Sequence, residues 1–142
     1  MSMIGFVLGL GDRHGENILI DVKEGGVVHV VPFRLTRNMV NGFGPTGVEG
    51  SFRRSCESTL RVMRDNKDTL LTRGQVKLHA PSTESVQLIL KRLEGHIVSP
   101  EVYKHKFSCA PMSLEGQVAK LIDISTDEKN LAQMYIGWGP FI

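Results

Sequence analysis

The chain has 142 residues, with 17 Lys or Arg against 15 Asp or Glu, so its formal net charge is only +2. This length can bury the core of one domain, while the near-neutral charge argues against direct nucleic-acid binding through a basic surface. The two cysteines, Cys56 and Cys109, form no CxxC pair, which argues against a cysteine zinc site and a disulfide framework and fits a reducing compartment.

The first ten residues are apolar but have no basic segment before them, so they do not predict a signal peptide. No apolar run approaches the ~20 residues that a membrane-spanning helix needs. We therefore expect a soluble, intracellular product without a membrane association.

A glycine-rich motif follows the apolar run Ile4–Leu8 and reads Gly9-Leu10-Gly11-Asp12-Arg13-His14-Gly15-Glu16-Asn17-Ile18-Leu19. Asp12 and Asn17 are separated by the interval found between the catalytic Asp and the metal-binding Asn of protein-kinase catalytic loops. On spacing alone, the favoured alternative is that both side chains satisfy backbone groups in a tight, glycine-rich turn.

Two short β-rich runs, Ile18–Asp21 and Val27–Val31, come next, and Gly25 and Gly26 lie between them. Glycines in such a short connection predict a β-hairpin.

Helical periodicity dominates the middle of the chain. Thr46-x-x-Glu49 has the spacing of a capping box and predicts a helix that extends to about Asp65. The expected apolar face of this helix is Phe52, Cys56, Leu60 and Met63. Its arginines are interrupted by Glu57 and Asp65, which favours a solvated face over a phosphate site.

The pattern weakens from Asn66 to Pro81, which indicates a divergent loop or a deletion. A second helical stripe then predicts a helix that Ser82 or Thr83 caps and Gly95 limits, with a packing role only. Its members are Val86, Ile89, Leu90, Leu93 and Ile97. A loop is expected over residues 98–111.

Two short helices joined by a tight turn are predicted at the C-terminal end. The first has the apolar face Leu114, Val118, Leu121 and Ile122. Ser125-x-x-Glu128 is a second capping-box spacing and leads to the stripe Leu131, Met134, Tyr135 and Trp138. For the terminal aromatics, core packing is favoured over a membrane or partner contact.

Four segments, in this order, resemble the phosphatidylinositol-kinase-related protein kinases, and the third of them resembles the ATR branch in its sequence. Gly9–Leu19 resembles the catalytic loop of that family, and Val31–Thr36 resembles the end of its activation loop. Gly44–Glu57 resembles the helix that follows, and Ser113–Ile142 resembles the C-terminal FATC module.

The resemblance implies an α+β, mostly α fold: a protein-kinase-like C-lobe fragment with catalytic loop, β-hairpin and helices, followed by a helical FATC module. The expected divisions are a partial catalytic C-lobe at 1–74, a variable connection with one helix at 75–111, and the FATC module at 112–142. In the family, the Gly-rich loop and the nucleotide-binding lysine precede the catalytic loop, so we expect the chain to be the C-terminal part of a larger polypeptide.

The resemblance also implies roles for three residues. Asp12 would act as the base or orienter of the substrate hydroxyl, and His14 would stabilise charge on the transferring phosphate. Asn17 would bind Mg²⁺ or Mn²⁺, and ATP would be the phosphate donor. The second metal-binding Asp of the family is missing, because the chain reads Val30-Val31-Pro32 at that point; Asp21 and Glu24 precede it, in or before the predicted turn.

The function implied is that of an ATR-type serine/threonine protein kinase of DNA damage checkpoint signalling in the nucleus. The implied partners are protein substrates with Ser or Thr followed by Gln, an adaptor protein of the ATR-interacting type, and the rest of the kinase polypeptide. We expect this chain alone to be inactive. The alternative is a non-catalytic interaction module, a pseudokinase or FATC fragment that binds kinase partners. A lipid kinase is a third possibility, because it shares the Asp-Arg-His-x-x-Asn pattern, but lipid kinases lack the C-terminal FATC sequence.

Overall fold

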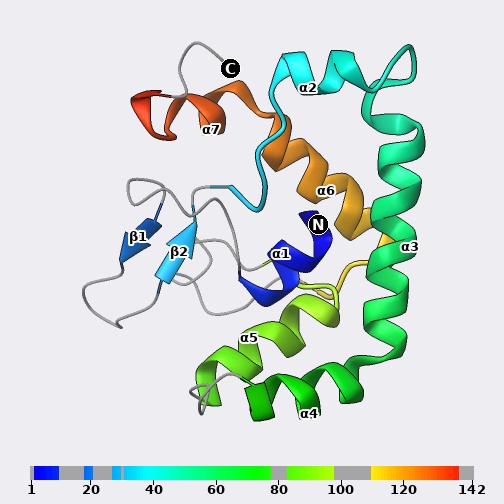
Figure 1. Ribbon diagram of the computed structural model, residues 1–142, viewed down its shortest axis with the longest axis vertical. Helices are drawn as coiled ribbons and strands as arrows, with labels where there is room; N and C mark the ends of the chain where they lie inside the picture. The colour runs from blue at the N-terminus through cyan, green and yellow to red at the C-terminus, as the bar shows by residue number, and fades with distance from the viewer. Residues whose placement is uncertain are drawn as a thin grey trace.

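The computed structural model describes residues 2–9, 18–20, 27–29, 31–77, 83–97 and 110–137. This part of the chain is mostly helical. Its elements are α1 (Ser2–Leu8), β1 (Ile18–Ile20), β2 (Val27–His29), α2 (Arg37–Gly42), the 3₁₀ helix η2 (Gly47–Glu49), α3 (Ser51–Asp65), α4 (Lys67–Lys77), α5 (Thr83–Leu93), α6 (Leu114–Thr126) and α7 (Glu128–Ala132). Figure 1 shows α3 along one side of the molecule, α1, α5 and α6 beside it, and the strands on the opposite side.

The two strands pair antiparallel, with Ile18 opposite His29 and Ile20 opposite Val27. The turn predicted at Gly25 and Gly26 lies outside the described residues.

The apolar face predicted for α3 is confirmed. Cys56, Leu60 and Met63 are buried, and Phe52 packs against them. The same cluster includes buried side chains of α1 and α6, namely Met3, Phe6, Val7, Val118, Leu121 and Ile122. Because each buried aliphatic or aromatic side chain contributes roughly 1.5–3 kcal/mol, this cluster is the main force that joins α6 to α1 and α3.

The capping box predicted at Thr46 is wrong. Thr46 makes no side-chain cap bond, and α3 begins at Ser51 after the N-cap residue Gly50. A Cβ at Gly50 would collide with the Thr46 hydroxyl, so a larger residue at position 50 would displace the Thr46 side chain. Glu49 instead pairs with Arg53 at 2.6 Å, one helical turn away.

Of the two alternatives predicted from Asn66 to Pro81, the divergent loop is wrong over most of its length, because α4 occupies Lys67–Lys77. The deletion stays a prediction. The first turn of α4 is exposed, and Leu70 packs against the core cluster. Because α4 contacts the core through few of its residues, its apolar residues do not recur with a clear helical period. The sequence pattern therefore did not predict this helix.

The stripe predicted for α5 is confirmed for Ile89, Leu93 and Ile97. Leu93 is buried, and Ile89 and Ile97 pack against the core. The helix ends in a Schellman motif, in which His96 N–H donates to Lys91 O at 3.0 Å and Gly95 N–H donates to Arg92 O at 3.3 Å. Gly95 has φ +101°, the left-handed conformation that this motif requires.

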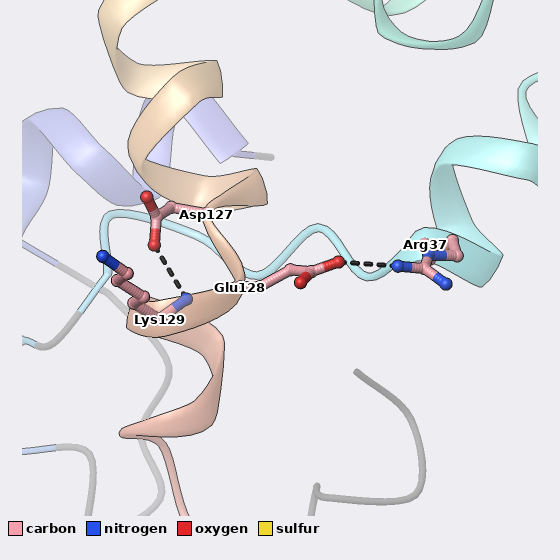
Figure 2. Close-up of polar contacts among 4 residues, drawn as sticks. All are labelled: Arg37, Asp127, Glu128 and Lys129. Carbon is pink, nitrogen blue, oxygen red and sulfur yellow. Dashed lines mark hydrogen bonds and ion pairs between the residues drawn. The ribbon is translucent and has the colours of Figure 1, made fainter.

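The C-terminal stripe is confirmed for Leu131 and Met134, which are buried, while Trp138 lies outside the described residues. The capping box predicted at Ser125 is wrong. Ser125 is buried inside α6, and Asp127 is the N-cap of α7. Its Oδ1 accepts from Lys129 N–H at 2.8 Å (Figure 2) and also from Asn130 N–H at 3.1 Å. Glu128 points away from this cap.

None of the helices in the described part of the chain combines the length and the apolar character needed to cross a bilayer.

Candidate functional site

The predicted catalytic residues Asp12, His14 and Asn17 lie outside the described residues. The structure describes the elements on both sides of their motif, α1 before it and β1 after it. Among the described residues, α5 packs on α1, and α6 and α7 contact the segment between β2 and α2.

Helix α1, which precedes the motif, is packed firmly into the core. In α1, Met3, Phe6 and Val7 are buried against α3 and α5. Gly9 N–H donates to Phe6 O at 3.2 Å, which closes the last turn of the helix three residues before Asp12. Gly9 has φ +72°, so the chain leaves α1 through a left-handed residue.

A side chain from α5 covers this exit. The Arg92 guanidinium lies 5.6 Å from the centroid of the Phe6 ring, and its Nη1 is 3.4 Å from Val7 O. A cation is favoured both over an aromatic face and beside the terminal carbonyls of a helix. Arg92 thus stabilises the C-terminal end of α1.

Gln117 of α6 joins three elements in the interior. Its side chain is completely buried, its Nε2 donates to Arg92 O at 2.7 Å and His96 O at 3.2 Å, and its Oε1 accepts from Arg64 Nη2 at 2.7 Å. The two carbonyls belong to the end of α5, where helical partners run out. One uncharged amide therefore satisfies groups of α3 and α5 together.

Arg64 is the charged member of this cluster. Burial lowers the pKa of its guanidinium from the ordinary value, and the carboxylate of Glu115 opposes that shift. Arginine still remains protonated at any physiological pH, so the Gln117 oxygen accepts a charge-assisted hydrogen bond.

The segment between β2 and α2 is held by the C-terminal helices. Val31 is buried in a small cluster with Leu131 and Met134. Leu35 N–H donates to Ser125 O at 3.2 Å. Thr36 is buried and caps α2 by accepting from Met39 N–H at 3.3 Å.

An ion pair adds to this clamp at the surface. Figure 2 shows Glu128, at the start of α7, reaching Arg37, at the start of α2; their closest atoms are 2.6 Å apart. Both side chains are 73% exposed, so the pair contributes at most about 1 kcal/mol. The buried contacts of Val31 and Leu35 determine the position of the segment.

Three phenylalanines fix the other side of the same segment. Phe33 meets Phe52 edge to face at 6.2 Å, and Phe52 stacks on Phe43 at 4.9 Å. Such pairs contribute about 0.5–1.5 kcal/mol each beyond their buried area. The segment is thus fixed between α3 on one side and the C-terminal helices on the other.

The part of the chain that the structure describes holds no complete magnesium site. Between Glu24 and Glu49 the chain has no Asp or Glu, and among the described residues no group of three or more His, Cys, Asp or Glu could hold a metal ion. Mg²⁺ in kinase sites is bound through carboxylates as well as substrate phosphates. Asn17 alone supplies one neutral oxygen.

Sequence reasoning missed Arg64, Arg92 and Gln117. A signal existed, because Gln117 follows Leu114 by three positions and Arg92 follows Ile89 by three, so both lie on the apolar faces of their helices. A polar residue on such a face predicts a buried hydrogen-bonding partner, although not its identity.

Comparison with known families gives two matches. The family described as phosphatidylinositol 3- and 4-kinase matches residues 1–30 and 30–84, and the FATC domain matches residues 111–142. Helix α5 after residue 84 lies between them.

Comparison with single proteins gives related results. The serine/threonine-protein kinase ATR of Drosophila melanogaster is 43% identical over 171 residues, which cover 100% of this chain and 7% of the relative. Protein kinase rad3 of Schizosaccharomyces pombe is 38% identical, over 99% of this chain and 7% of the relative. Among solved structures, the FAT and kinase domain of CtTel1 superposes with a TM-score of 0.66 and 34% identity, over 99% of this chain and 11% of that one. The chain thus spans only a small part of the proteins it matches.

Proposed function

Because this chain belongs to the phosphatidylinositol 3- and 4-kinase family and ends in a FATC domain, we propose that it forms the C-lobe and FATC part of an ATR-type serine/threonine protein kinase. The observation that carries this proposal is the identity of 43% and 38% to the ATR and rad3 kinases, which extends over 99% or more of the chain. The proposed divisions are a C-lobe part at 1–74, a connection at 75–111 and the FATC module at 112–142.

The proposed site centres on the motif after α1. Asp12 accepts the proton of a Ser or Thr hydroxyl as that oxygen bonds to the γ-phosphorus of ATP and ADP leaves. His14 stabilises the charge on the transferring group. The substrates are proteins in which Gln follows the Ser or Thr. The anchored end of α1 and the clamped segment Val31–Thr36 support these roles, because phosphoryl transfer depends on positioning more than on covalent chemistry.

The activity of the chain by itself is a separate matter. Family members are kinases, which use ATP with Mg²⁺ or Mn²⁺, but here the second metal carboxylate is missing. Only residues 30–35 connect β2 to the α2 N-cap Thr36, and none of them is acidic. The division of the kinase-family match at residue 30 agrees with a shortened connection. We therefore propose that the 142-residue chain alone does not transfer phosphate.

A phosphotransfer assay tests this proposal. The chain and its Asp12→Ala variant are incubated with radiolabelled ATP, Mg²⁺ or Mn²⁺, and a Ser-Gln peptide, with an Ala-Gln peptide as the substrate control. We expect the two proteins to give equal, background labelling. Incorporation into the Ser-Gln peptide that Asp12→Ala abolishes would show that the chain is a complete catalyst.

The second candidate function is a non-catalytic interaction module. It is favoured by the same missing carboxylate together with an intact clamp between the segment Val31–Arg37 and helices α6 and α7. Such a module would bind the rest of the kinase polypeptide or an ATR-interacting adaptor in the nucleus. Excess chain added to an active ATR-type kinase would then lower its activity, whereas an unrelated protein of equal charge would not.

The transcript supplies a further test. Sequencing across the codons for Val30 and Pro32 shows whether a longer product with an Asp at this junction is made. A product that encodes the acid would favour the catalytic function over the interaction module.

A further inference from the structure

The cluster around Gln117 connects the C-terminal helices to the point where the chain enters the Asp12 motif. Gln117 holds the main chain of Arg92 at 2.7 Å, while the guanidinium of Arg92 lies over Phe6 and beside Val7 O. The contact is continuous from α6 through α5 to α1.

The geometry at Gly9 makes this contact sensitive to position. A Cβ at Gly9 would lie 3.0 Å from Arg92 Nη1, so the guanidinium packs directly on the backbone of the residue where α1 ends. Asp12 is three residues further along the chain. Displacement of Arg92 would therefore loosen the last turn of α1, where Gly9 N–H donates to Phe6 O.

The C-terminal end of α5 is held in place by hydrogen bonds from the FATC segment. Met112 N–H donates to Gly95 O at 3.1 Å, and Gln117 binds the carbonyls of Arg92 and His96, so two contacts from the FATC side fix it. Arg64 of α3 holds Gln117 in turn. Interior groups of this kind have few alternative arrangements, because a buried amide that loses partners costs about 1–3 kcal/mol for each unsatisfied group.

We propose that Arg92 is a positioning residue for the start of the Asp12 motif, and that Gln117 of the FATC segment sets the position of Arg92. This inference rests on the proposed function of the motif and adds a route by which the FATC module acts on it. The residue that carries the route lies between the two segments that match known families.

Hydrogen exchange of the 142-residue chain tests the proposal without depending on phosphate transfer. The variants are Arg92→Met, which keeps the aliphatic stem and removes the guanidinium, and Gln117→Met. The control variants are Arg54→Met on the exposed side of α3 and Gln87→Met on the exposed side of α5. Peptides that cover residues 2–9, α3 and α6 are followed.

For Arg92→Met, we expect exchange of residues 6–9 to rise about tenfold or more, while exchange in α3 and α6 changes by less than about twofold, since local opening has its own free energy. Gln117→Met should raise exchange in residues 6–9 in the same direction, and neither control should do so. Arg92→Lys, which keeps a cation near Phe6 but lacks the planar fork, should give an intermediate rise.

Two results would overturn the proposal. Unchanged exchange of residues 6–9 in Arg92→Met would show that the guanidinium does not hold the end of α1. An equal rise in all helices, or a Gln117→Met effect confined to α6, would show a merely structural cluster. Should Arg92→Met not fold, the comparison of Arg92→Lys with Arg54→Lys decides in the same way. If the chain shows no kinase activity, the proposed function of the motif can fail while these hydrogen-exchange results still test the role of Arg92.

Discussion

At the scale of single residues, a few positions combine burial with a constrained backbone or with several hydrogen bonds. Gly95 combines a positive φ with a close approach to Met112, and Gln117 satisfies three partners without any exposure. Cys56 is buried in the same core as Leu60. Each of these residues therefore gives a sharp mutational or chemical test.

Gly95→Ala should destabilise the chain by about 3 kcal/mol, because the left-handed conformation and a clash with Met112 O act together. Gly44→Ala is the matched control: Gly44 has φ +86° but open space around its Cβ position, so only about 1 kcal/mol is expected. Urea unfolding followed by circular dichroism measures both. Equal losses would mean that the contact with Met112 has no energetic weight.

Cys56 should be protected from alkylation. Burial raises the pKa of its thiol, and a raised pKa leaves less thiolate, the reactive form, at any given pH. In a Cys109→Ser background, iodoacetamide at pH 8 should modify the native chain at least about tenfold more slowly than the urea-unfolded chain. The rate of the native chain should also begin to rise at a higher pH. Similar rates in both states would contradict the buried placement.

At the scale of elements, helix ends decide how the segments meet. The Schellman motif of α5 faces Met112 and Gln117, and the N-cap of α2, Thr36, follows the segment held by Ser125 O. The start of α7 carries both its own cap, Asp127, and the ion pair of Glu128 with Arg37 (Figure 2). These junctions are short, so removing one capping side chain should destabilise the helix that begins at that cap.

Asp127→Ala should cost about 1 kcal/mol, since two amide groups of α7 lose their acceptor. Ser125→Ala should be neutral or slightly stabilising, because the buried Ser125 hydroxyl has no hydrogen-bond partner among the described residues. Thermal unfolding of the two variants beside the wild type is the measurement. A larger loss for Ser125→Ala would favour the capping box that the sequence predicts.

At the scale of the whole molecule, one hydrophobic cluster includes α1, α3 and α6. The FATC helix α6 thus completes the core instead of resting on its surface. The kinase-family match and the FATC match consequently cover parts of one packed unit over the described residues, joined by α5 (Figure 1).

Leu121→Ala should lower the free energy of unfolding by about 2–5 kcal/mol, because it leaves a cavity between α6 and α3. The loss should appear equally in hydrogen exchange of α1, α3 and α6, as expected for a cooperative unit. Ile136→Ala, at an 85% exposed position, should change stability by less than about 0.5 kcal/mol. Separate opening of α6 with α1 and α3 intact would contradict a shared core.

The sequence by itself determined the apolar faces of α3, α5 and α6, the Asp12–Asn17 motif and the family resemblance, because helical periodicity and motif spacing are local properties of the chain. Only the tertiary structure decided that Asp127 caps α7 in place of Ser125, that α4 forms, and that Arg92 and Gln117 join α6 to α1. Buried polar contacts depend on which helix ends, distant in the sequence, lie side by side in the fold. A local sequence pattern does not determine that arrangement.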